Sequence, residues 1–458
     1  MSHPAQNASL TEPATHVATD GSRIRRVRSF AAVVSGNFLE WFDWTVYAVF
    51  TPYIAANFFD PGNPTSAVLN TLAIFAVGFL ARPLGGYLLG RFGDLRGRKS
   101  ALVVAMTMMA IGSLLIAILP TFEQVGVWAS LFLLVARLLQ GLAHGGESGN
   151  SYSYLAEIAP KDKRGLWGSS IMFTITLGVM AATALGAGLT SVIPEESMDA
   201  WGWRIPFIIG GVLALFALYL RRAADESPFF EAVQRDREMR TARPVSRHQL
   251  TIIAVRILAL GILTQVLYYT WMSFFSSYAI SAKGMDKNGA YVASLCAQIV
   301  ALIALPLWGA FSDRVGRRRT YYLWAGAVIV VVLPISRILT DQPWSLFLAQ
   351  SIALIVWAMQ ASIHSTVMAE QAPTEARSTS VGIWTSVAAA ATGGTAPYLN
   401  TWLTLNDKSW IFSAYIIGLA VITLVALRWV PETAGLEMDE IPLPGEPTPM
   451  PMPTRVTA

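Results

Sequence analysis

Apolar stretches long enough to cross a lipid bilayer recur along most of this chain, and they constrain its fold more than any other feature. A bilayer core about 30 Å thick requires roughly 20 mostly apolar residues in a helix. Such stretches lie at 30–58, 67–90, 99–119, 126–158, 165–190, 203–222, 250–280, 289–312, 319–339, 344–368, 376–402 and 408–430. The sequence therefore predicts an all-α membrane protein with twelve transmembrane helices.

Charged residues are scarce, and this limits the class of protein further. They make up 14% of the chain, whereas a soluble domain carries roughly 25%, so a water-soluble enzyme is nearly excluded. The single cysteine, Cys296, cannot form an intramolecular disulfide or a cysteine-rich metal site. The five histidines are scattered and no phosphate-binding G-x-x-x-x-G-K-[ST] loop occurs. We therefore expect no enzyme, metal site or cofactor, and no ATP-driven transport by this chain.

The placement of lysine and arginine predicts the orientation in the membrane. With the N-terminus inside, the cytoplasmic segments hold 25 of the 33 basic residues and the outside loops hold three. This is the positive-inside pattern of a multi-pass protein of the plasma (inner) membrane with both termini in the cytoplasm. It explains the net charge of +4 without a nucleic-acid partner.

Two loop signatures each occur twice, which predicts an internal repeat. The pattern G-x-x-x-D-x-x-G-R-[RK] occupies 90–99 and 309–318, and the pattern E-x-x-P-x-x-x-R occupies 157–164 and 370–377. Because both repeat at nearly one spacing, we expect two pseudo-symmetric six-helix bundles. We also expect these loops to form cytoplasmic gating contacts that latch the two bundles together. The gating residues are Gly90, Asp94, Gly97, Arg98, Glu157, Arg164, Gly309, Asp313, Gly316, Arg317, Glu370 and Arg377.

The repeat divides the chain into five parts. The bundles should span 30–222 and 250–430, joined by a charged cytoplasmic loop at 223–249. The terminal segments 1–29 and 431–458 are polar or proline-rich, so we expect disordered cytoplasmic tails.

These signatures carry a family resemblance, together with the stretches at 36–44 (GNFLEWFDW), 81–86 (ARPLGG), 137–141 (RLLQG), 145–147 (GGE) and 201–206 (WGWRIP). From about residue 30 to 435 the chain resembles the major facilitator superfamily, in its metabolite:H⁺ symporter branch. The resemblance implies alternating access between two six-helix bundles, driven by a proton gradient. Its substrates would be small metabolites such as α-ketoglutarate, citrate, shikimate, aromatic acids, proline or betaine.

Charged residues inside the predicted spans are the candidate functional residues, because each costs on the order of 3 kcal/mol at the bilayer centre. Glu40 and Asp43 are three residues apart and so lie on one helix face. Two carboxylates that lie close together in a low-dielectric environment cannot easily both ionise, because their negative charges repel each other. We therefore expect at least one of them to couple transport to protons, together with Arg137 and Glu147.

Two buried arginines, Arg82 and Arg137, suit a carboxylate substrate, since a guanidinium binds a carboxylate in a bidentate manner. At the repeat offset of 213, Arg137 corresponds to Gln350 and Glu147 to Gln360, so charge is concentrated in the N-terminal half. The C-terminal half should contribute neutral hydrogen bonds and shape. The predicted substrate-binding residues are Arg82, Arg137, Tyr47, His144, Gln265, Tyr268, Gln360 and Trp384.

The leading hypothesis is uptake of a small organic acid, such as α-ketoglutarate or a related mono- or dicarboxylate, with protons. The alternatives are a transporter of a zwitterionic osmolyte (proline or betaine) and a non-transporting membrane sensor on the same scaffold. Sugar porters and drug antiporters fit less well, because Thr264-Gln265-Val266 lacks the sugar-porter glutamine pair and 178–187 lacks proline. The expected partners are protons, the substrate and the lipid bilayer, and we expect a monomer.

Overall fold

The computed structural model describes residues 37–446, except 48, 61–63, 223–244, 394 and 406. The predicted tail 1–29 and most of the predicted central loop lie outside this part of the chain. The side chains of Arg98 and Glu147, two of the predicted functional residues, also lie outside the description.

The N-terminal half is built from helices that follow the predicted spans. Residues 37–47 are helical and lead into the short α2. The elements that follow are α2 (Thr51–Phe58), α3 (Pro64–Arg96), α4 (Arg98–Ile118), α5 (Phe122–Val125), α6 (Val127–Ile158), α7 (Arg164–Val192), α8 (Glu195–Ala200), η1 (Gly202–Arg204) and α9 (Ile205–Arg222).

The C-terminal half repeats this organisation with two interrupted spans. The first span is α11 (Arg247–Leu267), a π-helical turn η2 (Tyr268–Ser273) and α12 (Phe275–Lys283). The remaining elements are α13 (Lys287–Val315), α14 (Arg317–Ile338), α15 (Pro343–Glu370), η3 (Thr374–Ala376), α16 (Arg377–Thr392), α17 (Thr395–Leu405), α18 (Ser409–Ala426) and η4 (Leu427–Trp429).

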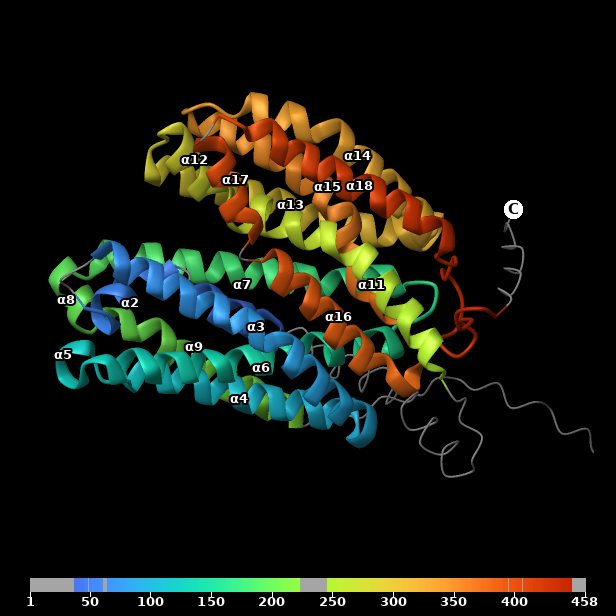
Figure 1. Cartoon of the computed structure of the whole chain (residues 1–458), viewed down its shortest axis with the longest axis horizontal. Coiled ribbons are helices and arrows are strands. Elements are labelled where there is room, and N and C mark those ends of the chain that lie inside the picture. Colours follow the sequence, from blue (N-terminus) through green and yellow to red (C-terminus); the bar gives the residue numbers. More distant parts are fainter. Residues whose placement is uncertain are drawn as a thin grey trace, which may run out of the picture.

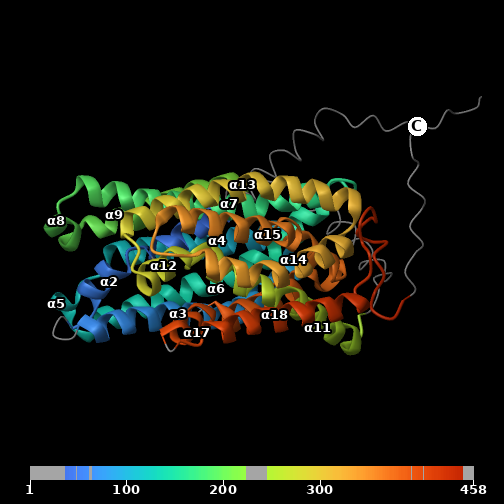
Figure 2. The same ribbon diagram turned by 90° about the horizontal axis from the view of Figure 1, so that it is seen from above.

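Each of the twelve predicted spans therefore coincides with helix in the described residues. Eight of the described helices are long and apolar enough to cross a membrane. The helices run side by side along one long direction, with α5 and α8 at one end (Figure 2). The two halves lie next to each other, with α16 against α3 and α6, and with α13 and α15 against α7 (Figure 1).

Glycines permit the closest helix contact in the N-terminal half. A Cβ on Gly145 of α6 would overlap the backbone carbonyl of Arg82 in α3, and a Cβ on Gly85 would overlap that of Leu142. Small residues let membrane helices approach backbone to backbone. This packing fixes Arg82 against α6 and so positions one of the predicted substrate-binding residues.

The four loop signatures gather at one end of the molecule, which we call the motif end. The carboxylate of Asp94 accepts from the backbone N–H groups of Ser378 (3.1 Å) and Thr379 (2.8 Å) at the start of α16. Asp313 accepts from Gly165 (2.7 Å) and Leu166 (2.8 Å) at the start of α7. Each half thus places an aspartate on a helix N-terminus of the other half, where a negative charge is favourable.

Buried ion pairs join the halves at the same end. Arg164 contacts Glu370 at 3.1 Å and Arg377 contacts Glu157 at 2.5 Å. Arg317 reaches both Asp313 at 2.8 Å and Glu370 at 3.7 Å. The turns between paired helices are made by Gly97 and Gly316 with φ of 103° and 107°, a conformation that favours glycine. The motif end is therefore closed.

The segment 431–446 differs from the disordered tail expected from the sequence. The Glu432 carboxylate accepts from the backbone N–H of Arg317 at 2.8 Å, and the Leu436 carbonyl accepts from Arg164 at 3.1 Å. Met438 is buried against Ala156 and Ala369, one from each half. Proline-rich composition did not reveal these contacts, because they depend on helix ends that are distant in sequence.

Candidate functional site

A polar cavity lies between the two halves, near the middle of the helices. Its free volume in this arrangement of the halves is about 30 Å³. Its lining residues come from both halves: Trp41, Arg82, Tyr152, Met172 and Ile175 from the first, and Thr264, Gln265, Tyr268, Trp357, His364, Thr385, Ser386 and Ala389 from the second. A site between the halves is where alternating access would expose a ligand to each side in turn.

Arg82 supplies the charge of this cavity. The guanidinium lies 5.4 Å from the ring centre of Trp44 and 5.2 Å from that of Phe79, and the side chain is only 4% exposed. It donates to the Tyr269 hydroxyl of the other half at 3.3 Å. Aromatic faces stabilise a cation without neutralising it, so Arg82 can still bind an anion.

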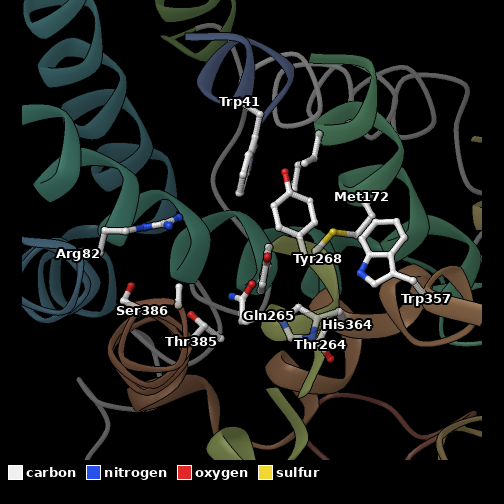
Figure 3. A pocket seen from close by; sticks show the side chains of 13 residues that line it. Trp41, Arg82, Met172, Thr264, Gln265, Tyr268, Trp357, His364, Thr385 and Ser386 are labelled. Atoms are coloured by element: carbon white, nitrogen blue, oxygen red, sulfur yellow. The ribbon is translucent and has the colours of Figure 1, made fainter. Parts of the chain in front are cut away.

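Neutral hydrogen-bonding groups share the cavity with Arg82. Ser386 and Thr385 of α16, Gln265 of α11 and His364 of α15 follow one another along one side, with Ser386 toward Arg82 (Figure 3). Amide and hydroxyl groups can both donate and accept. This side of the cavity therefore suits the uncharged oxygen atoms of a ligand or a second carboxylate.

Aromatic rings form the rest of the wall. Trp41 lies edge-on to Tyr268 at a centroid distance of 5.2 Å, and Tyr268 is tilted against Trp357 at 5.9 Å. Met172 and Trp357 close the side away from Arg82 (Figure 3). The cavity thus combines one charged side, one neutral polar side and an apolar wall, as small-molecule sites commonly do.

One predicted proton-coupling carboxylate lies directly behind the cavity wall. Glu40 Oε1 is 2.5 Å from His144 Nδ1, and both side chains are buried. The His144 ring is 5.0 Å from the ring of Trp41, which itself lines the cavity. A single side chain therefore separates this pair from the ligand space.

The second carboxylate, Asp43, has different partners. It accepts hydrogen bonds from the Ser113 hydroxyl and from Gln140 Nε2, the latter at 2.7 Å. Arg137 donates to Gln140 Oε1 at 2.8 Å. The Arg137 guanidinium also lies 4.2 Å from the ring centre of Tyr47. Although Glu40 and Asp43 share a helix face, α6 and α4 therefore give them separate environments.

The structure brings three of the predicted substrate-binding residues to the cavity, namely Arg82, Gln265 and Tyr268. Four others lie behind it. Arg137 and Tyr47 are stacked in the interior of the N-terminal half, and His144 is paired with Glu40. Gln360 donates to the Tyr321 hydroxyl at 2.6 Å and contacts His364 at 2.9 Å, so it supports a lining residue.

Trp384 lies in a different place from the one predicted. It lines a separate hollow at the motif end, between α3, α11 and α16, together with Arg91 and Asp94. Trp384 directly precedes Thr385 and Ser386 in α16, and the helix turns by about 100° per residue. Its side chain therefore points to a different side from those of Thr385 and Ser386, which line the cavity.

Sequence reasoning missed several lining residues. Trp41 lies between Glu40 and Asp43 in the sequence, and this position could have identified it as a candidate. His364 lines the cavity four residues after the predicted Gln360, on the same helix. The hydroxyls of Thr264, Thr385 and Ser386 gave no signal, because such residues inside helices usually bond to their own backbone. Among the described side chains, no group of three or more histidine, cysteine, aspartate or glutamate residues could hold a metal ion.

Comparisons with known protein families agree with this geometry. The family described as "Sugar (and other) transporter" matches residues 29–251, and the Major Facilitator Superfamily matches residues 290–451. Among solved structures, the proton:xylose symporter XylE bound to 6-bromo-6-deoxy-D-glucose superposes with a TM-score of 0.77. The superposition covers 92% of this chain and 98% of that one at 17% identity, which is a likeness of fold.

Curated relatives are similar over nearly their whole lengths. The α-ketoglutarate permease of Escherichia coli (strain K12) is 34% identical over 434 residues, covering 94% of this chain and 100% of the permease. The citrate-proton symporter of Klebsiella pneumoniae is 31% identical, covering 91% and 95%. A putative proline/betaine transporter of Staphylococcus haemolyticus is 32% identical, covering 85% of each chain.

Proposed function

Because this chain belongs to the major facilitator superfamily, a family of transporters and not of enzymes, we propose that it carries a small organic acid together with protons across the membrane. The observation that carries this proposal is the position of Arg82. It is a buried guanidinium on the wall of a cavity shared by both halves. A guanidinium in a dry pocket binds carboxylates more strongly than other small polar groups.

Proton coupling follows from the charges of the described side chains around the cavity. Arg82 and Arg137 balance Glu40 and Asp43, so this cluster is neutral when His144 is neutral. An anionic substrate would then add an uncompensated charge to a low-dielectric site, which is costly. One proton taken up with a monoanion removes that charge, and each proton taken up with a dianion such as α-ketoglutarate removes one of its two charges. Each proton also lowers the electrical cost of moving the anion inward against an inside-negative potential.

The residues that line the cavity favour an organic acid with a second polar group. One carboxylate would lie at Arg82, and a keto oxygen or second carboxylate would lie at Gln265, Thr385 and Ser386. The relatives named for α-ketoglutarate and citrate carry compounds of this class. We therefore propose α-ketoglutarate or a related mono- or dicarboxylate as the substrate.

A zwitterionic osmolyte is the second candidate, and one observation favours it. The rings of Trp41, Tyr268 and Trp357 lie close together on the wall away from Arg82. Aromatic faces bind quaternary ammonium groups, so betaine could place its carboxylate at Arg82 and its ammonium group against these rings.

Alternating access would move the two halves about this cavity. We propose that the motif end faces the cytoplasm, with the central loop and both termini on that side of the inner membrane, as the basic residues indicate. The closed motif end then corresponds to a state in which the cytoplasmic exit is shut. We propose that the protein works as a monomer.

The test uses purified protein in liposomes with an imposed pH gradient, acidic outside. We expect accumulation of radiolabelled α-ketoglutarate that a protonophore abolishes. Unlabelled citrate, proline, betaine and shikimate added as competitors rank the substrate classes. Inhibition by betaine alone would favour the osmolyte, and no gradient-driven uptake of any of these compounds would overturn the proposal.

A further inference from the structure

Two carboxylates near the centre of the molecule could each carry the coupling proton, and their surroundings differ. We infer that the Glu40–His144 pair takes up and releases this proton, whereas Asp43 stays ionised as the fixed counter-ion of Arg137. The inference rests on the proposed proton-coupled function. It assigns the proton to one site within that function.

Glu40 and His144 form a buried carboxylate–imidazole ion-pair contact. Glu40 Oε1 and His144 Nδ1 are 2.5 Å apart, and the side chains are 2% and 0% exposed. An imidazole and a carboxylate in ion-pair contact can each accept a proton. With a neutral ring and an ionised carboxylate the pair carries a charge of −1, and one added proton makes it neutral. The pair can therefore change charge without breaking apart.

Asp43 is held by a fixed set of donors. Gln140 Nε2 donates to Asp43 Oδ2 at 2.7 Å and to Ser113 Oγ at 3.0 Å, and Ser113 in turn donates to Asp43 Oδ1. Arg137 donates to Gln140 Oε1 at 2.8 Å, which fixes the amide with its nitrogen toward Asp43. Hydrogen bonds donated to a carboxylate favour its charged form, so this network offsets part of the cost of burying an ionised Asp43.

The Glu40–His144 pair and Asp43 also differ in how close they lie to the cavity. The His144 ring lies 5.0 Å from the Trp41 ring, which lines the cavity. Asp43 instead lies inside the N-terminal half, where a Cβ on Gly210 of α9 would be 2.9 Å from its Oδ1. A small movement of Trp41 would expose the Glu40–His144 pair to water in the cavity. Exposure of Asp43 would require separation of helices within one half.

Several charged and titratable groups face the pair from the surrounding elements. Arg82 of α3 and Arg137 of α6 act electrostatically on His144, and Tyr152 of α6 acts on Glu40. From the C-terminal half, Tyr268 packs on Trp41 and Tyr269 bonds to Arg82. An anion bound at Arg82 would offset the repulsion between that guanidinium and a protonated His144. Substrate and proton should therefore each favour binding of the other, as linkage requires.

The experiment compares proton uptake with ligand binding for one set of variants. α-Ketoglutarate is added to purified protein in weakly buffered detergent solution containing a pH dye. Wild type should take up about one proton for each α-ketoglutarate bound. Glu40→Gln and His144→Gln should bind α-ketoglutarate with little or no proton uptake. Asp43→Asn should take up as many protons per bound α-ketoglutarate as wild type does, even if it binds less α-ketoglutarate.

Transport in liposomes gives the second measurement. A gradient of about one pH unit should raise accumulation by wild type roughly tenfold for each coupled proton. Glu40→Gln should show no such rise, while it still exchanges external labelled for internal unlabelled α-ketoglutarate. As a control, His248→Gln changes an exposed histidine of α11 that lies outside the cavity lining, and should keep its response to the gradient.

The outcomes separate this inference from the proposed function. If wild type neither binds α-ketoglutarate nor responds to the gradient, the proposed function fails. If wild type responds and Glu40→Gln responds equally, the assignment to the Glu40–His144 pair is overturned and the proposed function stands. Loss of proton uptake only in Asp43→Asn would also overturn the assignment, and would place the proton on Asp43. If Glu40→Gln or His144→Gln fails to fold, it shows neither binding nor exchange. The other of these two variants then tests the assignment of the proton.

Discussion

Arg82 and Tyr269 belong to different halves of the molecule, and the guanidinium of Arg82 donates to the hydroxyl of Tyr269 at 3.3 Å. The bond crosses the boundary between α3 and the π-helical turn η2, beside the cavity. The residue proposed to bind the substrate therefore also joins the two halves. A carboxylate that arrives at Arg82 would compete with this bond, which links substrate binding to movement of the halves.

Substitution of Arg82 tests its proposed contact with the substrate. Arg82→Lys keeps the positive charge but loses the fork geometry, so α-ketoglutarate binding should weaken by about 1.5–3 kcal/mol, the usual contribution of a hydrogen bond to a charged group. Calorimetric titration of purified protein measures this change. Arg256→Lys on α11, outside the cavity lining, is the control and should bind as wild type does. Equal affinity of Arg82→Lys and wild type would rule out a bidentate contact.

Tyr269→Phe removes only the cross-half hydrogen bond. Since Arg82 then loses a competing partner, we expect equal or tighter binding of α-ketoglutarate and a faster exchange between open and closed states. Titration together with counterflow rates checks both effects. Weaker binding in Tyr269→Phe would instead indicate that the hydroxyl itself contacts the substrate.

The close contact between α3 and α6 predicts a strong effect of a single methyl group. Gly145→Ala places a Cβ into the backbone carbonyl of Arg82, so the helices must separate, at a cost of about 1–3 kcal/mol. Thermal unfolding in detergent should show a clear loss of stability. Gly188→Ala on α7 meets no atom within 4 Å and should leave the unfolding temperature nearly unchanged. Similar unfolding temperatures for both variants would contradict the observed helix packing.

The cross-half ion pairs predict that the motif end opens when one of them is broken. Loss of one partner of a buried ion pair costs about 3–5 kcal/mol. Part of this cost should destabilise the closed state relative to a state in which the motif end is open. Glu157→Gln removes the negative charge that contacts Arg377, so closure should weaken.

A cysteine at Ser365, whose hydroxyl donates to the Gly168 carbonyl across the halves at 3.1 Å, reports on this opening. In a Cys296→Ser background, labelling of Ser365→Cys should be several-fold faster when Glu157→Gln is added. Glu123→Gln on the short α5, far from the motif end, is the control substitution. Unchanged labelling would show that the Glu157–Arg377 pair does not hold the motif end shut.

The packed segment 431–446 predicts a contribution to stability that a disordered tail could not make. Met438→Asp would bury a carboxylate against Ala156 and Ala369, at a cost of about 2–5 kcal/mol. We expect a lower unfolding temperature and faster labelling of Ser365→Cys. The exposed neighbour Asp439, changed to Asn, should behave as wild type. No difference between the two variants would indicate that the segment does not hold the halves together.

Much of the architecture could be predicted from the sequence because the membrane simplifies the problem. Each span must be apolar and about as long as the bilayer is thick, so the spans were predicted correctly to within a few residues, apart from breaks such as η2 and the gap before α17. The repeated signatures around Asp94 and Asp313 predicted contacts at one end, and the structure places both aspartates on helix N-termini of the opposite half.

The candidate site was less predictable, because a helical pattern does not fix the rotation of a helix about its axis. Arg137 and Gln360 lie on helices that line the cavity, yet they point into their own halves. Glu40 and Asp43 share a helix face, but Ser113 and Gln140 on neighbouring helices separate their environments. No spacing along the chain contains this information, since the partners are 70 and 97 residues away from Asp43.

The central claim is that an organic anion and a proton cross the membrane together, and proton movement on addition of substrate tests it most directly. α-Ketoglutarate is added outside wild-type liposomes in a lightly buffered medium with no initial gradient, and the external pH is recorded. We predict an alkaline shift in step with uptake of label, absent from empty liposomes and from Arg82→Gln. Uptake of α-ketoglutarate without any change in external pH would contradict the account.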